Sequence, residues 1–186
     1  MEPKKSRISL SGAYKLLHPM HTILVTSVDK AEKANIITLA WAMPTSINPP
    51  LVAISVRPTR HSHKLIEETR EFVVNIPIME IAKEILFCGR RSGKNYDKFI
   101  ETKLTPLAAK SVKTPIIKEC IAHLECTLTQ TFTTGDHTIF VGEVVEAYAD
   151  EESFQEEFDS RKAKLVYHLG GNKFATLSNE VIEPSL

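Results

Sequence analysis

Two short stretches of the sequence combine cationic and hydroxyl side chains at a spacing that suits an anionic ligand. The first holds Arg57, Arg60, Ser62 and Lys64, and the second holds Arg90, Arg91, Ser92, Lys94 and Lys98. An arginine can grip a phosphate with two parallel hydrogen bonds, and Ser62 would suit the N-cap of a helix whose free amides favour an anion. The two stretches predict either a phosphate-bearing ligand or a solvated basic face, and the residue types alone favour neither.

Histidines and cysteines offer two further kinds of chemistry. The close histidine pairs are His18 with His21 and His61 with His63. No third ligand follows either pair at metal-site spacing, so hydrogen-bonded histidines are favoured over a metal centre. Cys88 precedes the cationic run GRRSGK, and nearby cations lower the pKa of a thiol. A core position is the more common fate of a free cysteine, here for Cys88 at a helix end and for Cys126 in a strand.

The usual nucleotide and hydrolase fingerprints are missing from the sequence. It has no GxGxxG after a strand, no GxxxxGK[ST] and no GxSxG, which argues against a Rossmann site, a P-loop and a hydrolase elbow. Trp41, His137 and Phe174 could instead pack against a flat aromatic ligand. Trp41, the only tryptophan, would suit the core equally well.

Composition indicates one globular domain over 1–186, with residues 1–12 as a flexible or interface arm. Of the 186 residues 42% are hydrophobic, and 23 Lys and Arg balance 23 Asp and Glu, which argues against nonspecific nucleic-acid binding. Three cysteines without a CxxC spacing favour a reducing compartment. No apolar run follows the N-terminal cations and none is long enough to cross a membrane, so we expect a cytoplasmic protein with no membrane contact.

The elements that must position these side chains are mostly strands. Apolar and β-branched runs predict strands over 21–28, 35–41, 51–56, 71–76, 121–134, 137–149 and 165–169. Residues 42–50 are expected to form a loop, and short helices are expected over 63–70 and 78–89 and after residue 90. Because the strands follow one another as hairpins, the pattern favours an antiparallel barrel with a few short inserted helices over a doubly wound sheet.

Three local signals refine these elements. Gly89 is expected to stop its helix, and Gly142 is a candidate bulge in a long strand. In 121–134, apolar and polar residues alternate, which predicts an antiparallel strand with one exposed face.

Seven pieces of the chain, in order, resemble the flavin reductase-like family of FMN-binding split-barrel proteins, which includes the flavoredoxins. They are HTILVTSVDKAEKANIITLAW, NPPLVAISVRPTRHSHKLI, EFVVNIP, CGRRSGKNYDKF, HLECTL, GDHTIFVGEV and LVYHLGGNKFATL. The resemblance covers about Pro19 to Leu177. It implies a mainly β antiparallel split barrel that dimerises and holds FMN non-covalently near the subunit interface.

The resemblance also implies which residues contact FMN. Thr38, Leu39, Ala40 and Trp41 would lie against the flavin, and Ser55, Val56, Arg57, Arg60 and Ser62 would contact the ribityl chain and phosphate. Asn75 and Ile76 would border the ring, Lys98 and His137 would approach the cofactor, and Phe174 would cover the ring. No catalytic residue is assigned, because the flavin itself would supply the redox chemistry.

The leading hypothesis is therefore an FMN flavoprotein that transfers electrons, as an NAD(P)H-dependent flavin reductase or a flavoredoxin-like carrier. Its expected partners are a second copy of the chain and NAD(P)H or a protein electron donor. A non-enzymatic FMN-binding or storage protein and a metal-binding β-barrel are the alternatives.

Overall fold

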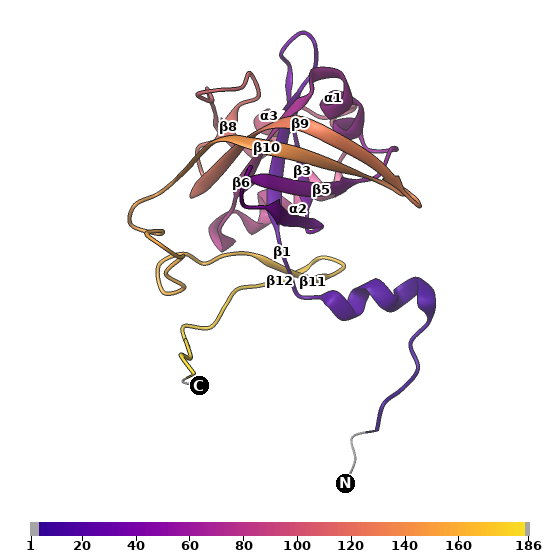
Figure 1. Cartoon of the computed structure of the whole chain (residues 1–186), viewed down its shortest axis with the longest axis vertical. Helices are drawn as coiled ribbons and strands as arrows, with labels where there is room; N and C mark the ends of the chain where they lie inside the picture. The colour runs from indigo at the N-terminus through magenta and orange to yellow at the C-terminus, as the bar shows by residue number, and fades with distance from the viewer. Residues whose placement is uncertain (1–3, 185–186) are drawn as a thin grey trace.

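The computed structural model describes residues 4–184 and is mainly β, with antiparallel sheets and a few short helices (Figure 1). The largest sheet has seven strands in the order β3-β2-β6-β9-β10-β5-β4, and every neighbouring pair is antiparallel. Its strands are β2 (Ile23–Val28), β3 (Ala34–Leu39), β4 (Ala42–Ser46), β5 (Leu51–Val56), β6 (Glu71–Ile76), β9 (Ala122–Thr134) and β10 (His137–Ala149). The mainly β antiparallel architecture predicted from the hairpin spacing is confirmed.

The sheet curls into a barrel because its two edge strands are neighbours in the chain. β3 and β4 lie at opposite ends of the strand order, yet only Ala40 and Trp41 separate them. The backbone N–H of Ser55 in β5 donates a 2.9 Å hydrogen bond to the carbonyl of Trp41. Trp41 therefore lies at the seam where the barrel closes.

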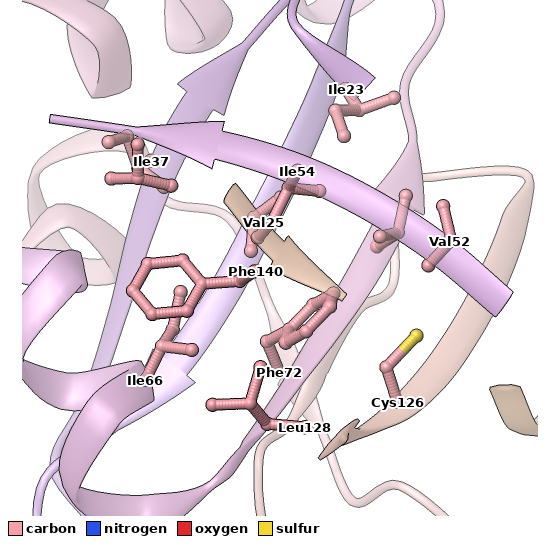
Figure 2. Close-up of a cluster of buried hydrophobic side chains, with 12 residues drawn as sticks. Ile23, Val25, Ile37, Val52, Ile54, Ile66, Phe72, Cys126, Leu128 and Phe140 are labelled. Atoms are coloured by element: carbon pink, nitrogen blue, oxygen red, sulfur yellow. The ribbon is translucent and has the colours of Figure 1, made fainter. Parts of the chain in front are cut away.

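The interior of the barrel is filled from one face of each strand (Figure 2). Ile23 and Val25 of β2 belong to this core while Leu24, between them, packs on the outside, as the two-residue period of a strand requires. The buried members are Ile23, Val25, Ile37, Val52, Ile54, Val56, Ile66, Phe72, Val74, Cys126, Leu128 and Phe140.

Two short helices cover the outer face of β2 and β3. These helices are α2 (Ala82–Arg90), which follows the 3₁₀ turn η2 (Met79–Ile81), and α3 (Lys98–Thr102). A second buried cluster joins them to the sheet, with Leu24 and Ile36 against Ile85 and Phe99. A small two-stranded sheet of β7 (Pro106–Leu107) and β8 (Ile116–Ile117) follows them in the chain. β2 is therefore buried on both faces, which explains its continuous run of buried residues.

A small sheet and an N-terminal arm lie beneath the barrel in Figure 1, at the end where both termini are found. The sheet has the strand order β1-β11-β12, from β1 (Met20–His21), β11 (Tyr167–Gly170) and β12 (Lys173–Ala175). The arm holds the 3₁₀ helix η1 (Leu10–Leu17), none of whose residues is buried. Residues 1–3 of the predicted arm lie outside the described residues. No helix in the described part of the chain is long and apolar enough to cross a membrane.

Two expectations about the stretch 42–62 are wrong. Part of the expected loop is the edge strand β4, whose Pro44 is tolerated because an edge strand has one side without a ladder partner. The helix after β5, α1 (His61–Thr69), is capped by Arg60, with no side-chain cap. Ser62 lies inside the helix, where its buried Oγ accepts a 2.7 Å hydrogen bond from Asn35 Nδ2. The hydrogen bond to buried Asn35 therefore accounts for the position of Ser62 inside the helix.

The two glycine predictions have opposite outcomes. Gly89 does not stop α2, which continues to Arg90; instead Gly89 lets the helix approach β3, since a Cβ there would lie 3.3 Å from Cβ of Thr38. Gly142 does lie at a bulge, because the pairing of β10 with β9 shifts register between Val141 and Gly142. A Cβ at Gly142 would lie 2.7 Å from Cζ of Phe72, so the core also requires glycine there.

The expected exposed face of β9 is wrong over the first half of the strand. His123 and Glu125 are buried, whereas Phe132 near the hairpin end is exposed. Glu125 accepts hydrogen bonds from the backbone of residues 110–112 and from the hydroxyl of Tyr148. Burial alone would raise the pKa of Glu125, but these hydrogen bonds outweigh it and lower that pKa. The loop carrying residues 110–112 covers a face that the alternation assigns to solvent.

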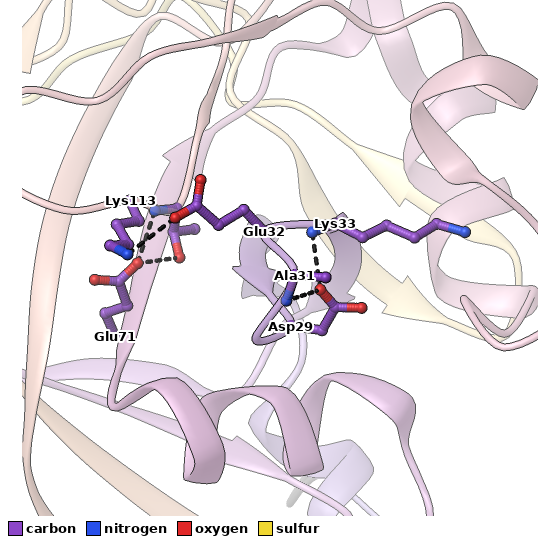
Figure 3. Close-up of polar contacts among 7 residues, drawn as sticks. Asp29, Ala31, Glu32, Lys33, Glu71 and Lys113 are labelled. Atoms are coloured by element: carbon purple, nitrogen blue, oxygen red, sulfur yellow. Dashed lines mark hydrogen bonds and ion pairs between the residues drawn. The ribbon is translucent and has the colours of Figure 1, made fainter.

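Polar contacts fix the end of the β2–β3 hairpin that is remote from Trp41 (Figure 3). The carboxylate of Asp29 accepts 2.9 Å hydrogen bonds from the backbone of Ala31 and Lys33. Glu32, which has a positive φ of 62°, pairs with Lys113 at 2.9 Å. Hydrogen bonds within the turn and the ion pair to Lys113 thus stabilise this end of the hairpin, and its strands pack on the core.

Candidate functional site

A cavity of about 260 Å³ lies where the barrel seam, α2, η1 and the small sheet meet. Most of the predicted cofactor contacts line it, namely Thr38, Leu39, Ala40, Trp41, Ser55, Val56, Arg57, Arg60, His137 and Phe174. These residues come from segments far apart in the sequence. The fold therefore brings together, around one cavity, residues that are far apart in the sequence.

Strand pairing explains why the seam, the end of β5 and the start of β10 coincide. β10 pairs antiparallel with β5, and Val56 stands opposite Thr138. Arg57, just after β5, is therefore beside His137, the first residue of β10. The hydrogen bond from Ser55 to the carbonyl of Trp41 adds the seam to the same corner.

A chain of aromatic and imidazole rings runs along the cavity wall. Trp41 and His137 face each other with ring centroids 4.7 Å apart and planes 33° from parallel. Tyr14 of η1 meets the edge of Trp41 at 5.8 Å, and His18 contacts both Tyr14 and His168, at 6.1 and 5.2 Å. His168 in turn lies 5.7 Å from Phe174. The wall therefore presents flat, polarisable surface to a ligand with a flat ring.

Arg57, Asp136 and His137 form a connected polar group at the rim. Arg57 Nη2 lies 2.8 Å from one carboxylate oxygen of Asp136, and Nδ1 of His137 lies 2.6 Å from the other. The hydrogen bond from His137 and, to a smaller extent, the charge of Arg57 lower the pKa of Asp136. The carboxylate is thus ionised at neutral pH, and Arg57 has an acidic partner beside it.

Arg60 is the cation most available to a ligand. It precedes the first turn of α1, where the amide of His63 donates to the carbonyl of Arg60 but the amides of His61 and Ser62 have no backbone acceptor among the described residues. Among residues 4–184, no ion pair or side-chain hydrogen bond engages its guanidinium, whereas Arg90 donates to the carbonyl of Gly171. No Asp or Glu of the described residues lines the cavity. Its electrostatic character is therefore cationic.

A second hollow of about 90 Å³ adjoins the first and shares Ile37, Arg60 and Gly89 with it. Arg91 and Lys98 also line this hollow. Burial lowers the pKa of Lys98 to about 8, and burial followed by the charges of Lys94 and Lys98 lowers the pKa of His61. The hollow is therefore a small, positively charged extension of the main cavity.

Four predicted contacts do not line the main cavity. Asn75 and Ile76 lie in β6, where buried Asn75 donates to the carbonyl of Leu24 and accepts from the backbone of Ile117. Lys98 Nζ donates to the carbonyls of Ile36 and Cys88, and Ser62 Oγ accepts from Asn35, so both are engaged structurally beside the second hollow. The hydrogen bonds of Ser62 and Lys98 therefore stabilise the walls of the site.

The nucleophile and metal alternatives find little support in the geometry. Cys88 is buried, and burial raises its thiol pKa to about 12, which outweighs the opposite effect of Lys98. Both ring nitrogens of His63 already have neighbours, Thr138 at 2.8 Å and Glu67 at 3.3 Å. Residues 4–184 contain no group of three or more His, Cys, Asp or Glu side chains placed to hold a metal.

A larger hollow exists but suits a different ligand. It measures about 1020 Å³ and is lined by the segment 152–162 with parts of the C-terminal segment. Its charged side chains are the acidic Glu152, Glu156, Glu157, Asp159 and Glu183, which outnumber the basic Arg161 and Lys162. Carboxylates in this number repel a phosphate, so the smaller cationic cavity is the better anion site.

Comparison with known proteins now decides the family. Residues 16–175 match the family described as flavin reductase like domain. The chain belongs to the flavin reductase-like family. A protein of Archaeoglobus fulgidus is 38% identical over 169 residues, which cover 90% of this chain and 94% of that one. Membership of the flavin reductase-like family supports a flavin-related role in electron transfer.

Solved flavoredoxin structures share the fold of nearly the whole chain. The flavoredoxin of Desulfovibrio vulgaris (Miyazaki F) superposes with a TM-score of 0.85 at 27% identity, covering 96% of this chain and 97% of its own. The flavoredoxin from Methanosarcina acetivorans gives 0.86 at 27% identity, with coverages of 97% and 95%. The expected split barrel is therefore confirmed.

The cavity also includes residues that the sequence did not assign to it. These are Tyr14, His18, Thr22, Ile37, Ile85, Leu86, Gly89, Arg90, His168 and Gly171. Arg90 could have been assigned from the sequence, because it belongs to the second basic stretch. Ile37 belongs to β3 of the barrel, and the others depend on how η1, α2 and the small sheet dock on it, which periodicity does not reveal.

Proposed function

We propose that the cavity binds FMN and that the protein transfers electrons through it. The observation that carries this proposal is the joining of a ring-lined cavity to a cationic hollow that has no acidic lining among the described residues. Together the two spaces come to the lower end of the ~300–1,000 Å³ typical of small-molecule sites. FMN has a flat redox-active ring at one end and a phosphate at the other, so the residues present fit it.

The ring of FMN would lie by Trp41, His137 and Phe174. A flavin gains stacking energy on such surfaces, and the β3 backbone beside Thr38 and Leu39 supplies polar groups at close range. Once bound, FMN supplies the redox chemistry, while the protein orients it and tunes its potential. His137 is placed to tune it, whereas Lys98 is committed to two backbone carbonyls.

The phosphate of FMN would lie at Arg60 and the first turn of α1. The amides of His61 and Ser62 and the guanidinium of Arg60 can all donate to phosphate oxygens. Gly93 lets its loop lie close to Asn35 at the adjoining hollow, because a Cβ there would lie 2.0 Å from Oδ1 of Asn35. Ser62 and Lys98 would support this region by holding Asn35 and the β3 backbone.

The proposed electron source is NAD(P)H, for a flavin reductase, or a protein donor, for a flavoredoxin-like carrier. The test is anaerobic addition of NADH or NADPH to the FMN-loaded protein while the flavin absorbance is followed. Rapid bleaching supports a reductase. Absent bleaching, with reduction by a chemical reductant, supports a carrier or a storage protein. A protein that takes up no FMN contradicts the whole proposal.

We also propose that two copies of the chain associate across the arm. Leu10, Leu16 and Leu17 of η1 are 89%, 71% and 71% exposed, and Val181 and Ile182 in the C-terminal segment are also exposed. Exposed apolar side chains gathered on one short helix, as on η1, favour an interface over a solvated face.

Light scattering tests this association. Leu16→Asp with Leu17→Asp should convert a dimer to a monomer, because charges would be buried without partners. Ile100→Asp, on equally exposed Ile100 of α3, is the matched control and should leave the mass unchanged. A monomeric wild-type protein would refute the association.

A further inference from the structure

His137 is restrained on two sides in the cavity. Its ring face lies against Trp41 at 4.7 Å, and its Nδ1 lies 2.6 Å from the carboxylate of Asp136. Its side chain is 14% exposed, and Nε2 has no hydrogen-bond partner among residues 4–184. A carboxylate only accepts hydrogen bonds, so Nδ1 carries the proton in this contact. Nε2 is then the ring nitrogen left to the cavity.

Asp136 is itself restrained although it is exposed. Arg57 holds its second carboxylate oxygen at 2.8 Å. The strand register makes this pairing possible, because Val56 stands opposite Thr138 and Arg57, just after β5, lies beside the turn that precedes β10. The group therefore runs from Arg57 through Asp136 to His137, ending at the cavity.

We propose that Asp136, held by Arg57, is a positioning residue that fixes His137 in the Nδ1-protonated tautomer, with Nε2 as the atom that exchanges hydrogen bonds or a proton with the ligand. The orientation of an imidazole by a carboxylate on its other nitrogen is a general device. Imidazole is also the side chain best suited to proton exchange near neutral pH. The purpose of this arrangement rests on the proposed binding of FMN, but the tautomer itself does not.

The tautomer is measured from ring nitrogen shifts of the full-length protein labelled with ¹⁵N, at a pH where imidazoles are neutral. In the wild type, His137 should be protonated on Nδ1. In Asp136→Ala it should change to the Nε2-protonated form, and Asp136→Glu should restore the original form. Arg57→Ala should give a mixture, because the carboxylate then loses its anchor.

His168 is an internal control for the same spectra. Its Nε2 lies 3.1 Å from the carbonyl of Gly171, which can only accept, so His168 should be protonated on Nε2 in every variant. An unchanged His137 tautomer in Asp136→Ala would overturn the positioning role.

Addition of FMN tests the second half of the proposal. The Nε2 shift of His137 should move on binding, and an Nε2 shift that stays fixed while FMN binds would overturn the assignment of that atom to the ligand. Absorbance measures FMN binding separately. A protein that fails to bind FMN therefore contradicts the proposed function, whereas the apo spectra still decide the role of Asp136.

Discussion

Arg60→Ala offers a specific test of where the phosphate lies. Arg60 lines both hollows and has no side-chain partner among the described residues, so the substitution should leave no buried group unpaired. A hydrogen bond to a charged group contributes ~1.5–3 kcal/mol when well shielded. Because Arg60 is exposed, solvent and salt reduce this to ~1–2 kcal/mol, which weakens binding about 5- to 30-fold.

The assay compares FMN with riboflavin, which has the same ring but no phosphate. Arg60→Ala should weaken FMN binding by this factor and leave riboflavin binding unchanged. Lys64→Ala is the matched control, because Lys64 lies one turn further along α1, is paired with Glu68 and does not line either hollow. Equal losses for both ligands, or no loss for FMN, would refute the phosphate assignment.

Three further predictions test the scaffold. Gly142→Ala should destabilise the protein by ~1–3 kcal/mol, because the added Cβ would overlap Phe72. Thermal unfolding measures the loss, and Gly12→Ala in the exposed arm is the control. Equal melting temperatures for Gly142→Ala and the wild type would contradict this prediction. Glu125 has a lowered pKa, so its contribution to stability is present above the unfolded pKa of ~4.3 and is lost as pH falls through the folded pKa. Glu125→Gln should lower the melting temperature at neutral pH, and the melting temperature of this variant should fall less than that of the wild type as the pH is lowered. Melting temperatures of the two proteins that fall in parallel would contradict this prediction. The three thiols, Cys88, Cys120 and Cys126, are buried with raised pKa values, so iodoacetamide should label them only after unfolding, and labelling of the native protein would show that the core opens.

The strands of the fold could be predicted because their signals are local. β5 and β6 match the predicted ranges 51–56 and 71–76, since an apolar run bounded by turn residues needs no tertiary information. β4 was missed because Pro44 within it, with Pro49 and Pro50 after it, indicates a loop, and its pairing with β5 comes from barrel closure. The burial of Glu125 was missed because the loop that covers it belongs to another part of the chain.

The site could be predicted in part for a related reason. Trp41, Arg60 and His137 belong to stretches with chemical character of their own, and the resemblance to a family joined them. Ser62 and Lys98 have equally suitable side chains, but in the structure they bond to Asn35 and to backbone carbonyls. Residue type predicts what a side chain can bind, whereas the fold decides which partner reaches it first. Tyr14 and His168 entered the cavity through the docking of η1 and the small sheet.

FMN binding in the cavity at Trp41 is tested most directly by the fluorescence of this residue. Trp41 is the only tryptophan in the chain and it lines the cavity, so its emission reports this site alone. Titration of the flavin-free protein with FMN should quench the emission to saturation at one FMN per chain, and Arg60→Ala should shift the curve to higher concentration. Emission that falls only in proportion to added FMN, without saturation, would contradict the account.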